Sequence, residues 1–256
     1  MKESRKLIEK LVKKTVNSII DAELCEWPPQ CTAIYYQPVR PKRNEKAEKR
    51  TIEKKKTGRL TVGVKGEHGV KSVNDFTAMC IRKGYVSEER APWLQYALDK
   101  RVISTLISIP ILVLGFILVP PAMATSFYLS FYLLRVRTNG FHANSALTCF
   151  VLSLFSVALF LGVLPKILSS MMELILFAIA TVLIYRLAPY NHPNMAMTEN
   201  ELAACAHSAK LRLIFLSFFV IACLTLHLKN FAQGTIFGII MVALSLAFAH
   251  YAELVI

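Results

Sequence analysis

Long apolar runs occupy the second half of the chain and predict membrane-spanning helices. A hydrocarbon core of about 30 Å needs about 20 apolar residues in helical form. Five runs meet this requirement, at residues 102–119, 146–164, 168–187, 211–228 and 235–254. A sixth run at 122–134 is shorter and follows Pro120 and Pro121, which end the preceding helix, so we expect it to return across the membrane as a short span. The pattern therefore predicts an all-α polytopic membrane protein with about six transmembrane helices.

Loops rich in basic residues alternate along the chain with loops that hold little charge, and this alternation favours six spans. The basic residues gather before the first span, after the second span and around the loop after the fourth span: Arg82, Lys83, Arg90, Lys100, Arg101, Arg135, Arg137, Arg186, Lys210 and Arg212. The loops on the opposite side hold little charge beyond Lys166 and Lys229. Because cytosolic loops of membrane proteins are enriched in Lys and Arg, this alternation predicts six spans with both termini in the cytosol. Five spans would place Arg135 and Arg137 on the opposite side.

The N-terminal residues follow a different apolar pattern, which has a helical period. Apolar side chains from Leu7 to Leu24 recur at this spacing, and six Lys or Arg residues lie between positions 2 and 14. The pattern predicts a basic amphipathic helix over residues 1–24 that lies on an anionic inner leaflet. A partner-binding helix and a disordered arm are the alternatives. Residues 73–99 predict a pair of amphipathic helices, in the cytosol or at the membrane surface, before the first span, with a helix start near Ser87; a simple juxtamembrane connector is the alternative.

The charge balance separates the two halves of the chain. Of 256 residues, 54% are apolar, yet the net charge is +13; residues 1–72 hold 18 of the 30 Lys and Arg residues, and residues 102–256 hold seven. This distribution excludes a single soluble globule, and six cysteines without a CxxC pair give no disulfide framework. Residues 42–72 have 11 basic and four acidic residues with no apolar period, which predicts a flexible basic segment. Its basic runs lack interleaved aromatic residues, so we expect no nucleic acid partner.

Two candidate catalytic residues follow the second span. They are His142 and Cys149, which are seven residues apart. The thiolate is the nucleophilic form of cysteine, and a neighbouring imidazole can generate it. On one unbroken helix the two Cα atoms would lie about 10.5 Å apart, which is too far for comfortable hydrogen bonding. We therefore expect the helix to begin after His142, near Asn144 or Ser145, so that the imidazole folds back. A packing cysteine and an interfacial histidine are the alternative on these residues alone.

The same segment resembles the accessory gene regulator B (AgrB) family of membrane peptidases, which process quorum-sensing peptide precursors. The matching residues are Arg135, Gly140, Phe141, His142, Ala143 and Cys149, with Asn139 in place of a glycine. A second match follows the fourth span, at Ala188-Pro-Tyr-Asn-His-Pro-Asn194, where Ala196-Met197 replaces a Pro-Leu pair. The resemblance covers about residues 73–256. It implies that Cys149 is the nucleophile and His142 its base. By the same resemblance Arg135 and Gly140 support the site, and no metal or cofactor is required.

The N-terminal segment resembles the precursor (AgrD-type) that such a peptidase cuts, with an amphipathic leader, a short Cys-led peptide and a tail. The tail begins with Tyr36, Gln37 and Pro38. Aligning it with the precursor pattern puts the scissile bond between Tyr35 and Tyr36. The product ring would run from Cys31 to Tyr35, which is five residues, whereas a ring from Cys25 would have eleven.

Three regions follow from the two resemblances. Residues 1–41 would be the precursor-like segment, with the leader at 1–24 and the ring and cleavage region at 25–41; residues 42–72 would be tail and linker, and residues 73–256 the peptidase. The implied function is a cysteine endopeptidase of the bacterial cell membrane that cuts after Tyr35 through a Cys149 acyl-enzyme and promotes closure of a thiolactone by Cys31. The active site would face the cytosol. The expected partners are a peptide precursor, here within the same chain, and an anionic bilayer; a homo-oligomer stays open.

Two other functional classes are compatible with the residues alone. A small transporter or exporter would use Arg135, His142 and Glu173 along one path. A membrane-anchored signalling protein would bind a partner through the basic N-terminal arm. No HExxH motif or paired intramembrane carboxylate indicates a metalloprotease or an aspartyl protease, because Glu173 is the one acidic residue well inside a span.

Overall fold

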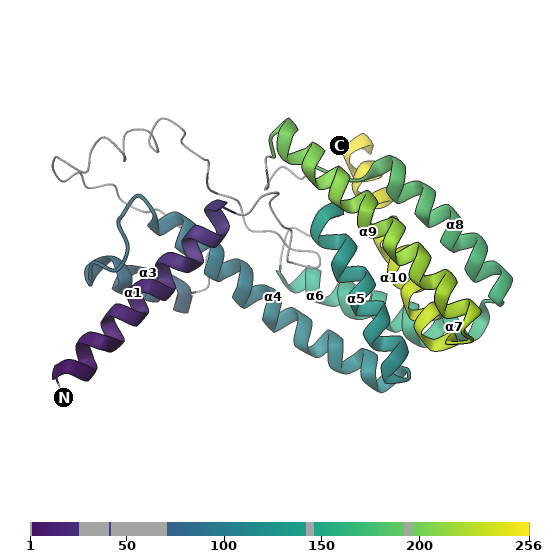
Figure 1. Cartoon of the computed structure of the whole chain (residues 1–256), viewed down its shortest axis with the longest axis horizontal. Coiled ribbons are helices and arrows are strands. Elements are labelled where there is room, and N and C mark those ends of the chain that lie inside the picture. The colour runs from purple at the N-terminus through teal and green to yellow at the C-terminus, as the bar shows by residue number, and fades with distance from the viewer. Residues whose placement is uncertain are drawn as a thin grey trace. The chain divides into compact units, whose positions relative to one another are not determined.

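The computed structural model describes residues 2–25, 41, 71–141, 146–191, 195 and 197–255 of the chain. All regular structure in this part is helical, which confirms the predicted all-α class. The chain divides into two compact units, one of Met1–Glu26 with Pro38–Lys100 and one of Trp27–Gln37 with Arg101–Ile256. The boundary between Lys100 and Arg101 falls inside one long helix, and each unit is described by itself (Figure 1).

The first unit joins the N-terminal helix to the segment before the first span. Its helices are α1 (Lys2–Cys25), α3 (Lys71–Arg82) and the first turns of α4 (Ala91–Leu118). The expected amphipathic helix is therefore present as α1. Val16 and Ile20 of α1 are almost fully buried in a cluster with apolar residues of α3 and α4. The charged side of α1 stays exposed, so the helical period seen in the sequence corresponds to a real division between a packed face and a polar face.

The expected pair of surface helices before the first span is only partly observed. The first is α3, but the second does not start near Ser87 or end before the span. Instead α4 begins at Ala91 and continues to Leu118 as one helix of 28 residues. Pro92 lies in its first turn, where proline is tolerated because the missing N–H would have no helical partner. The helix continues without a break through Lys100 and Arg101, after which its apolar run begins.

The second unit is a helical bundle. After α4 come α5 (Pro121–Thr138), α6 (Ala146–Val157), a π-helical segment η1 (Ala158–Val163), α7 (Leu164–Ile167), α8 (Ser170–Leu187), α9 (Glu199–Thr225) and α10 (Lys229–Val255). Five stretches of the described helices are long and apolar enough to cross a membrane: Ala91–Leu118, Phe150–Ile167, Ser170–Leu187, Glu199–Thr225 and Lys229–Tyr251. The sixth expected span corresponds to α5, which has 18 residues but is less apolar because it carries buried hydroxyl and arginine side chains. About six spans is thus consistent with this bundle.

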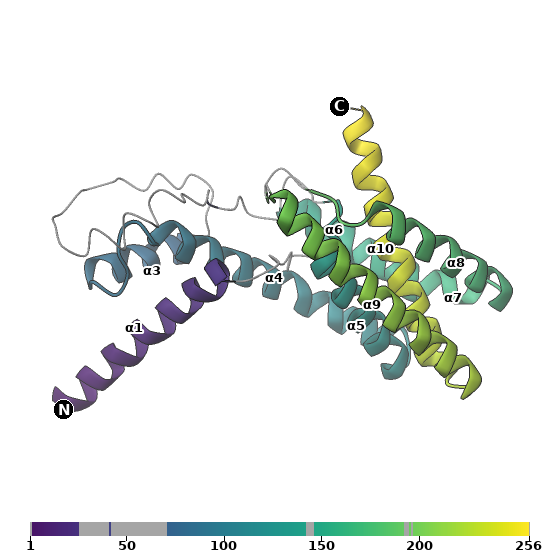
Figure 2. The same cartoon turned by 45° about the horizontal axis from the view of Figure 1, so that its top comes forward.

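Helix α10 is the central helix of the bundle. It packs against α5, α8 and α9, and Figures 1 and 2 show α8, α9 and α10 side by side. Gly234 and Gly238 lie one turn apart on its α5 face. A Cβ at Gly234 would overlap the Met123 carbonyl oxygen, and one at Gly238 would lie 2.8 Å from the Phe127 carbonyl oxygen. Small residues at this spacing allow two membrane helices to approach closely.

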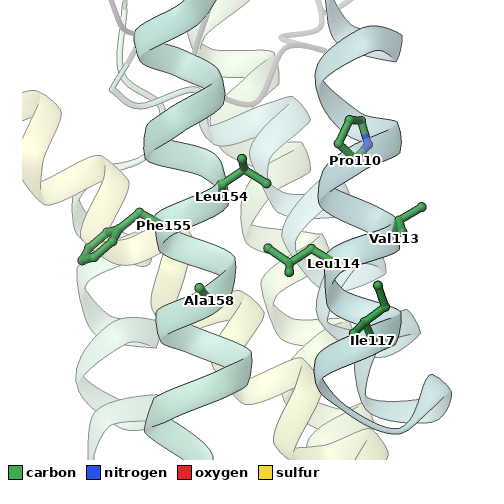
Figure 3. A pocket seen from close by; sticks show the side chains of 7 residues that line it. All are labelled: Pro110, Val113, Leu114, Ile117, Leu154, Phe155 and Ala158. Carbon is green, nitrogen blue, oxygen red and sulfur yellow. The ribbon is translucent and has the colours of Figure 1, made fainter.

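The outer faces of the bundle are apolar, as expected for contact with lipid chains. Large hydrophobic side chains such as Phe155, Phe215 and Phe218 are more than half exposed. An apolar groove of about 580 Å³ lies between α4 and the α6–η1 helix (Figure 3). It is lined by Pro110, Val113, Leu114, Ile117, Leu154, Phe155 and Ala158. Exposed surface of this kind fits a bilayer rather than water.

Candidate functional site

The guanidinium of Arg135 is the centre of a buried polar cluster at the end of α5. The side chain is 2% exposed. It donates hydrogen bonds to the carbonyl oxygens of Asn139 and Phe141, the latter at 2.5 Å, and to the hydroxyl of Ser245 on α10 at 3.0 Å. Burial of a guanidinium is costly unless its N–H groups have acceptors. Arg135 therefore ties the segment that follows α5 to its own helix and to α10.

The chain turns sharply directly after α5, at two residues with positive φ. Asn139 has φ 56° and Gly140 has φ 118°. The φ of 56° and ψ of −130° at Asn139 lie outside the left-handed helical region that asparagine tolerates, so both positions have backbone conformations that favour glycine. A Cβ at Gly140 would also overlap the Arg135 guanidinium and lie 3.0 Å from the Ser245 hydroxyl oxygen. Arg135 and Gly140 are thus brought together, because the guanidinium needs the space that the missing side chain leaves.

The two segments that carry the sequence motifs meet at this turn. The N–H of Tyr190 donates to the Thr138 carbonyl oxygen at 2.9 Å. In return the carboxamide of Asn139 donates to the Tyr190 carbonyl oxygen, also at 2.9 Å. Asn139, which replaces a glycine in the motif, therefore has a specific role in this chain. The pairing joins the end of α5 to the loop after α8, which is 51 residues further along the chain.

The loop after α8 is also bonded to itself. The Asn191 carboxamide accepts from the N–H of Met197 at 3.0 Å and donates to the Met197 carbonyl oxygen at 3.1 Å. Helix α9 then starts with a capping box between Thr198 and Glu201. Residues 192–194 and 196, which include His192, lie outside the described residues. The two ends of this loop are nevertheless fixed by bonds of described residues.

Helix α10 supplies contacts to this cluster that no motif in the sequence indicates. The carbonyl oxygen of Ser245 accepts from the N–H of Phe141 at 3.1 Å, in addition to the bond of its hydroxyl with Arg135. His250 lies 3.2 Å from the Leu187 carbonyl oxygen and packs its ring against Tyr190. In the sequence, Ser245 and His250 are two of the few polar residues in the apolar run at 235–254.

The proposed reactive pair is only partly described. Cys149 lies in the first turns of α6, whose first residue is Ala146. The Cys149 side chain and the whole of His142 lie outside the described residues, as do Cys31, Tyr35, Tyr36, Gln37 and Pro38. Phe141 is not helical, and its N–H and carbonyl groups are both bonded. The chain is therefore fixed immediately before His142 and again from Ala146 onward.

A second polar group lies between α5 and α9, at the same end of the bundle. Arg137 is 7% exposed and hydrogen-bonds the thiol of Cys205. Arg212 donates to the Leu133 carbonyl oxygen at 2.6 Å. Cationic side chains in the last turn of a helix interact favourably with its dipole, so these arginines stabilise the end of α5. Among the described residues, no group of three or more His, Cys, Asp or Glu side chains could hold a metal ion.

Glu173 lies at the opposite end of the bundle from Arg135. It is in the first turn of α8 and accepts a hydrogen bond from Gln233 at 2.6 Å. Leu187, at the far end of α8, contacts His250 near the Arg135 cluster. The rise along the intervening helix is about 20 Å. The structure therefore does not bring Arg135 and Glu173 together as neighbours on one polar path.

Comparison with known proteins gives one family. A family model described as Accessory gene regulator B matches residues 74–246. No curated protein and no solved structure matches the chain. The matched range contains the turn after α5, the start of α6, the loop after α8 and Ser245, so the residues that form the polar cluster all fall within it.

Proposed function

Because the chain belongs to the accessory gene regulator B family, we propose that it cuts a peptide precursor as a membrane-embedded cysteine endopeptidase, with Cys149 as nucleophile and His142 as base. Membership of this family supports a role in autoinducer peptide processing in quorum sensing. The observation that carries the finer proposal is the Arg135 cluster, which holds Phe141, the residue directly before His142, through both its N–H and its carbonyl oxygen. A reactive imidazole needs a fixed position relative to its thiol, and this cluster provides a rigid starting point for it.

The first chemical step transfers an acyl group from nitrogen to sulfur. His142 takes the proton of the Cys149 thiol, and the thiolate attacks the carbonyl carbon of Tyr35. The bond between Tyr35 and Tyr36 breaks, and His142 returns the proton to the departing amine of Tyr36. The product is a thioester between Tyr35 and Cys149. Because substrate and enzyme are one chain in this proposal, the thioester is a branched chain with the mass of the uncut protein.

The second step moves the acyl group to another sulfur. The thiol of Cys31 loses its proton to His142 and attacks the thioester carbonyl, and Cys149 leaves as a thiolate that recovers the proton. This closes a thiolactone ring from Cys31 to Tyr35. The step exchanges one thioester for another and is near thermoneutral, whereas the first step is uphill. Holding the groups together raises their effective concentration, and a site at the bilayer edge excludes water that would hydrolyse the thioester.

The proposed order of regions follows the sequence. Residues 1–41 would be the precursor segment, 42–72 its tail and linker, and 73–256 the peptidase. The Arg135 cluster would lie at the cytosolic face of the membrane. This orientation is supported by the basic residues near the same ends of the helices, among them Arg186 and Lys210.

Mass spectrometry of variants of the full chain tests the assignment of roles. We expect His142→Ala to keep the bond between Tyr35 and Tyr36 intact. We expect Cys31→Ala to stop after the first step, so that no thiolactone forms and the chain keeps the mass of the uncut protein. A Cys205→Ala variant is the control, because it removes a cysteine of the bundle to which the proposal gives no chemical role. Normal ring formation by His142→Ala, or equal loss in Cys205→Ala, would refute the assignment.

A further inference from the structure

The second half of α1 is held by the segment that precedes the first span. Val16 is 3% exposed and Ile20 is fully buried. They pack in one apolar cluster with residues of α3, of the turn after it and of the start of α4: Cys80, Val86, Trp93, Leu94 and Tyr96. The first half of α1 is different, since Leu7, Ile8 and Leu11 are each more than half exposed. The helix therefore has a packed half and a half whose apolar side chains are free for lipid.

Polar contacts fix the register of α1 on this surface. The Asn17 carboxamide donates to the Tyr85 carbonyl oxygen at 3.0 Å and accepts from the Arg90 guanidinium at 2.9 Å. Arg90 also forms an ion pair with Asp21. Asn17 and Asp21 are four residues apart, as are Val16 and Ile20, so each pair lies on one side of the helix. Apolar burial alone would let the helix slide, whereas these bonds select one position.

We propose that α3, the turn after it and the first turns of α4 form a docking surface for the leader helix of the precursor, here α1. The inference rests on the proposed function, because it treats α1 as the substrate leader. The recognised feature would be an amphipathic helix with an apolar pair and an adjacent Asn–Asp pair, as in Val16-Asn17-x-x-Ile20-Asp21. Lys10, Lys13 and Lys14 are exposed and stay available for anionic lipid.

Docking of the leader would limit the volume that the scissile bond can explore. Tyr35 is ten positions after Cys25, the last residue of α1. This length of chain spans at most about 35 Å. A leader seated on the peptidase thus keeps the ring segment within that reach of its seat, which raises the effective concentration of the bond to be cut. Lipid alone would confine the leader to the membrane plane without choosing the enzyme.

A charge exchange between Arg90 and Asp21 tests the docking surface in the full chain. Arg90→Glu places two carboxylates together, and adding Asp21→Arg restores an opposite pair. Each variant is synthesised in a cell-free system into liposomes that contain anionic lipid. The initial rate of cutting between Tyr35 and Tyr36 is measured by mass spectrometry. Amide exchange of α1 is measured in parallel in the uncut Cys149→Ala background. Arg82→Glu is the matched control, because it makes the same charge change at an exposed position of α3.

We expect Arg90→Glu to accelerate amide exchange of α1 and to slow cutting by about three- to tenfold. We expect the double variant to return both quantities to within about twofold of the unmodified chain, and Arg82→Glu to leave both unchanged. Faster exchange with an unchanged cutting rate would overturn the recognition role, and so would a double variant as slow as Arg90→Glu. No cutting by the unmodified chain would instead overturn the proposed function, and with it the role of α1 as substrate.

Discussion

Replacing Ser245 by alanine isolates one contact of the Arg135 cluster. The hydroxyl of Ser245 accepts from the Arg135 guanidinium at 3.0 Å, and its carbonyl oxygen accepts from the N–H of Phe141. Ser245→Ala removes the first bond and leaves the second. Because Ser245 and Arg135 are both buried, water does not readily replace the lost acceptor. The perturbation therefore acts on the position of the guanidinium rather than on the backbone of α10.

The expected effect follows from the energy of a hydrogen bond to a charged group, about 1.5–3 kcal/mol. Arg135 keeps the carbonyl acceptors of Asn139 and Phe141, so we take the lower value. A loss of about 1.5 kcal/mol in the positioning of His142 slows the chemical step by about tenfold. Cleavage within one chain is a unimolecular event, so its rate constant reports this step without a contribution from substrate binding in solution.

The assay follows the full chain during cell-free synthesis into liposomes, with samples analysed by mass at successive times. Ser130→Ala is the matched control, because Ser130 is also buried and its hydroxyl bonds only a carbonyl of its own helix, that of Phe127, among the contacts described. We expect Ser245→Ala to be about tenfold slower and Ser130→Ala to be close to the unmodified chain. Equal rates for Ser245→Ala and the unmodified chain would refute the reasoning, as would an equal slowing by both variants.

Three further predictions concern the turn after α5 and the first unit. Gly140→Ala should abolish measurable cutting while the chain stays membrane-inserted, because a Cβ at positive φ would overlap the Arg135 guanidinium; cutting at the normal rate would contradict this. Asn139→Ala should lower the thermal midpoint of the bundle, measured by circular dichroism in detergent, because the bond to Tyr190 is lost while the residue still carries a Cβ at positive φ; an unchanged midpoint would show that this bond is not stabilising. Burial raises the pKa of the Cys80 thiol, so less thiolate is present at any given pH, and alkylation of Cys80 should remain slow at pH 8 and rise with pH. Peptide mapping after timed alkylation would measure it, and rapid labelling at pH 7 would contradict the burial of Cys80.

The helices could be predicted from the sequence where one side of a helix contacts lipid. The predicted run at 168–187 is largely apolar from Leu174 to Tyr185, many of its side chains are exposed on the outside of the bundle, and α8 forms there. Helix α5 was harder, since it is enclosed by other helices and can hold hydroxyl and charged residues. Its expected end at residue 134 was too early, because Arg135 and Arg137 are buried in its last turn rather than in a loop.

The candidate site could be predicted only in part. Arg135 and Gly140 were identified from their motif, and their mutual contact explains why both belong to it. The contribution of Ser245 depends on how α10 packs against α5, which no local pattern in either helix encodes. The same holds for Tyr190, whose backbone pairs with Thr138 across a long stretch of chain. Contacts between distant segments arise from packing. The sequence therefore indicated the motif residues but not the residues that contact them, Ser245 and Tyr190.

The central claim is that Cys149 forms a thioester with Tyr35, and neutral hydroxylamine tests it most directly. In the Cys31→Ala chain the ring cannot close, so the branched thioester should accumulate with the mass of the uncut protein. Hydroxylamine should then split it into residues 1–35, as a hydroxamate, and residues 36–256. The same chain with Cys149→Ala added should not split. Splitting that persists without Cys149, or fragments that end at another residue, would contradict the account.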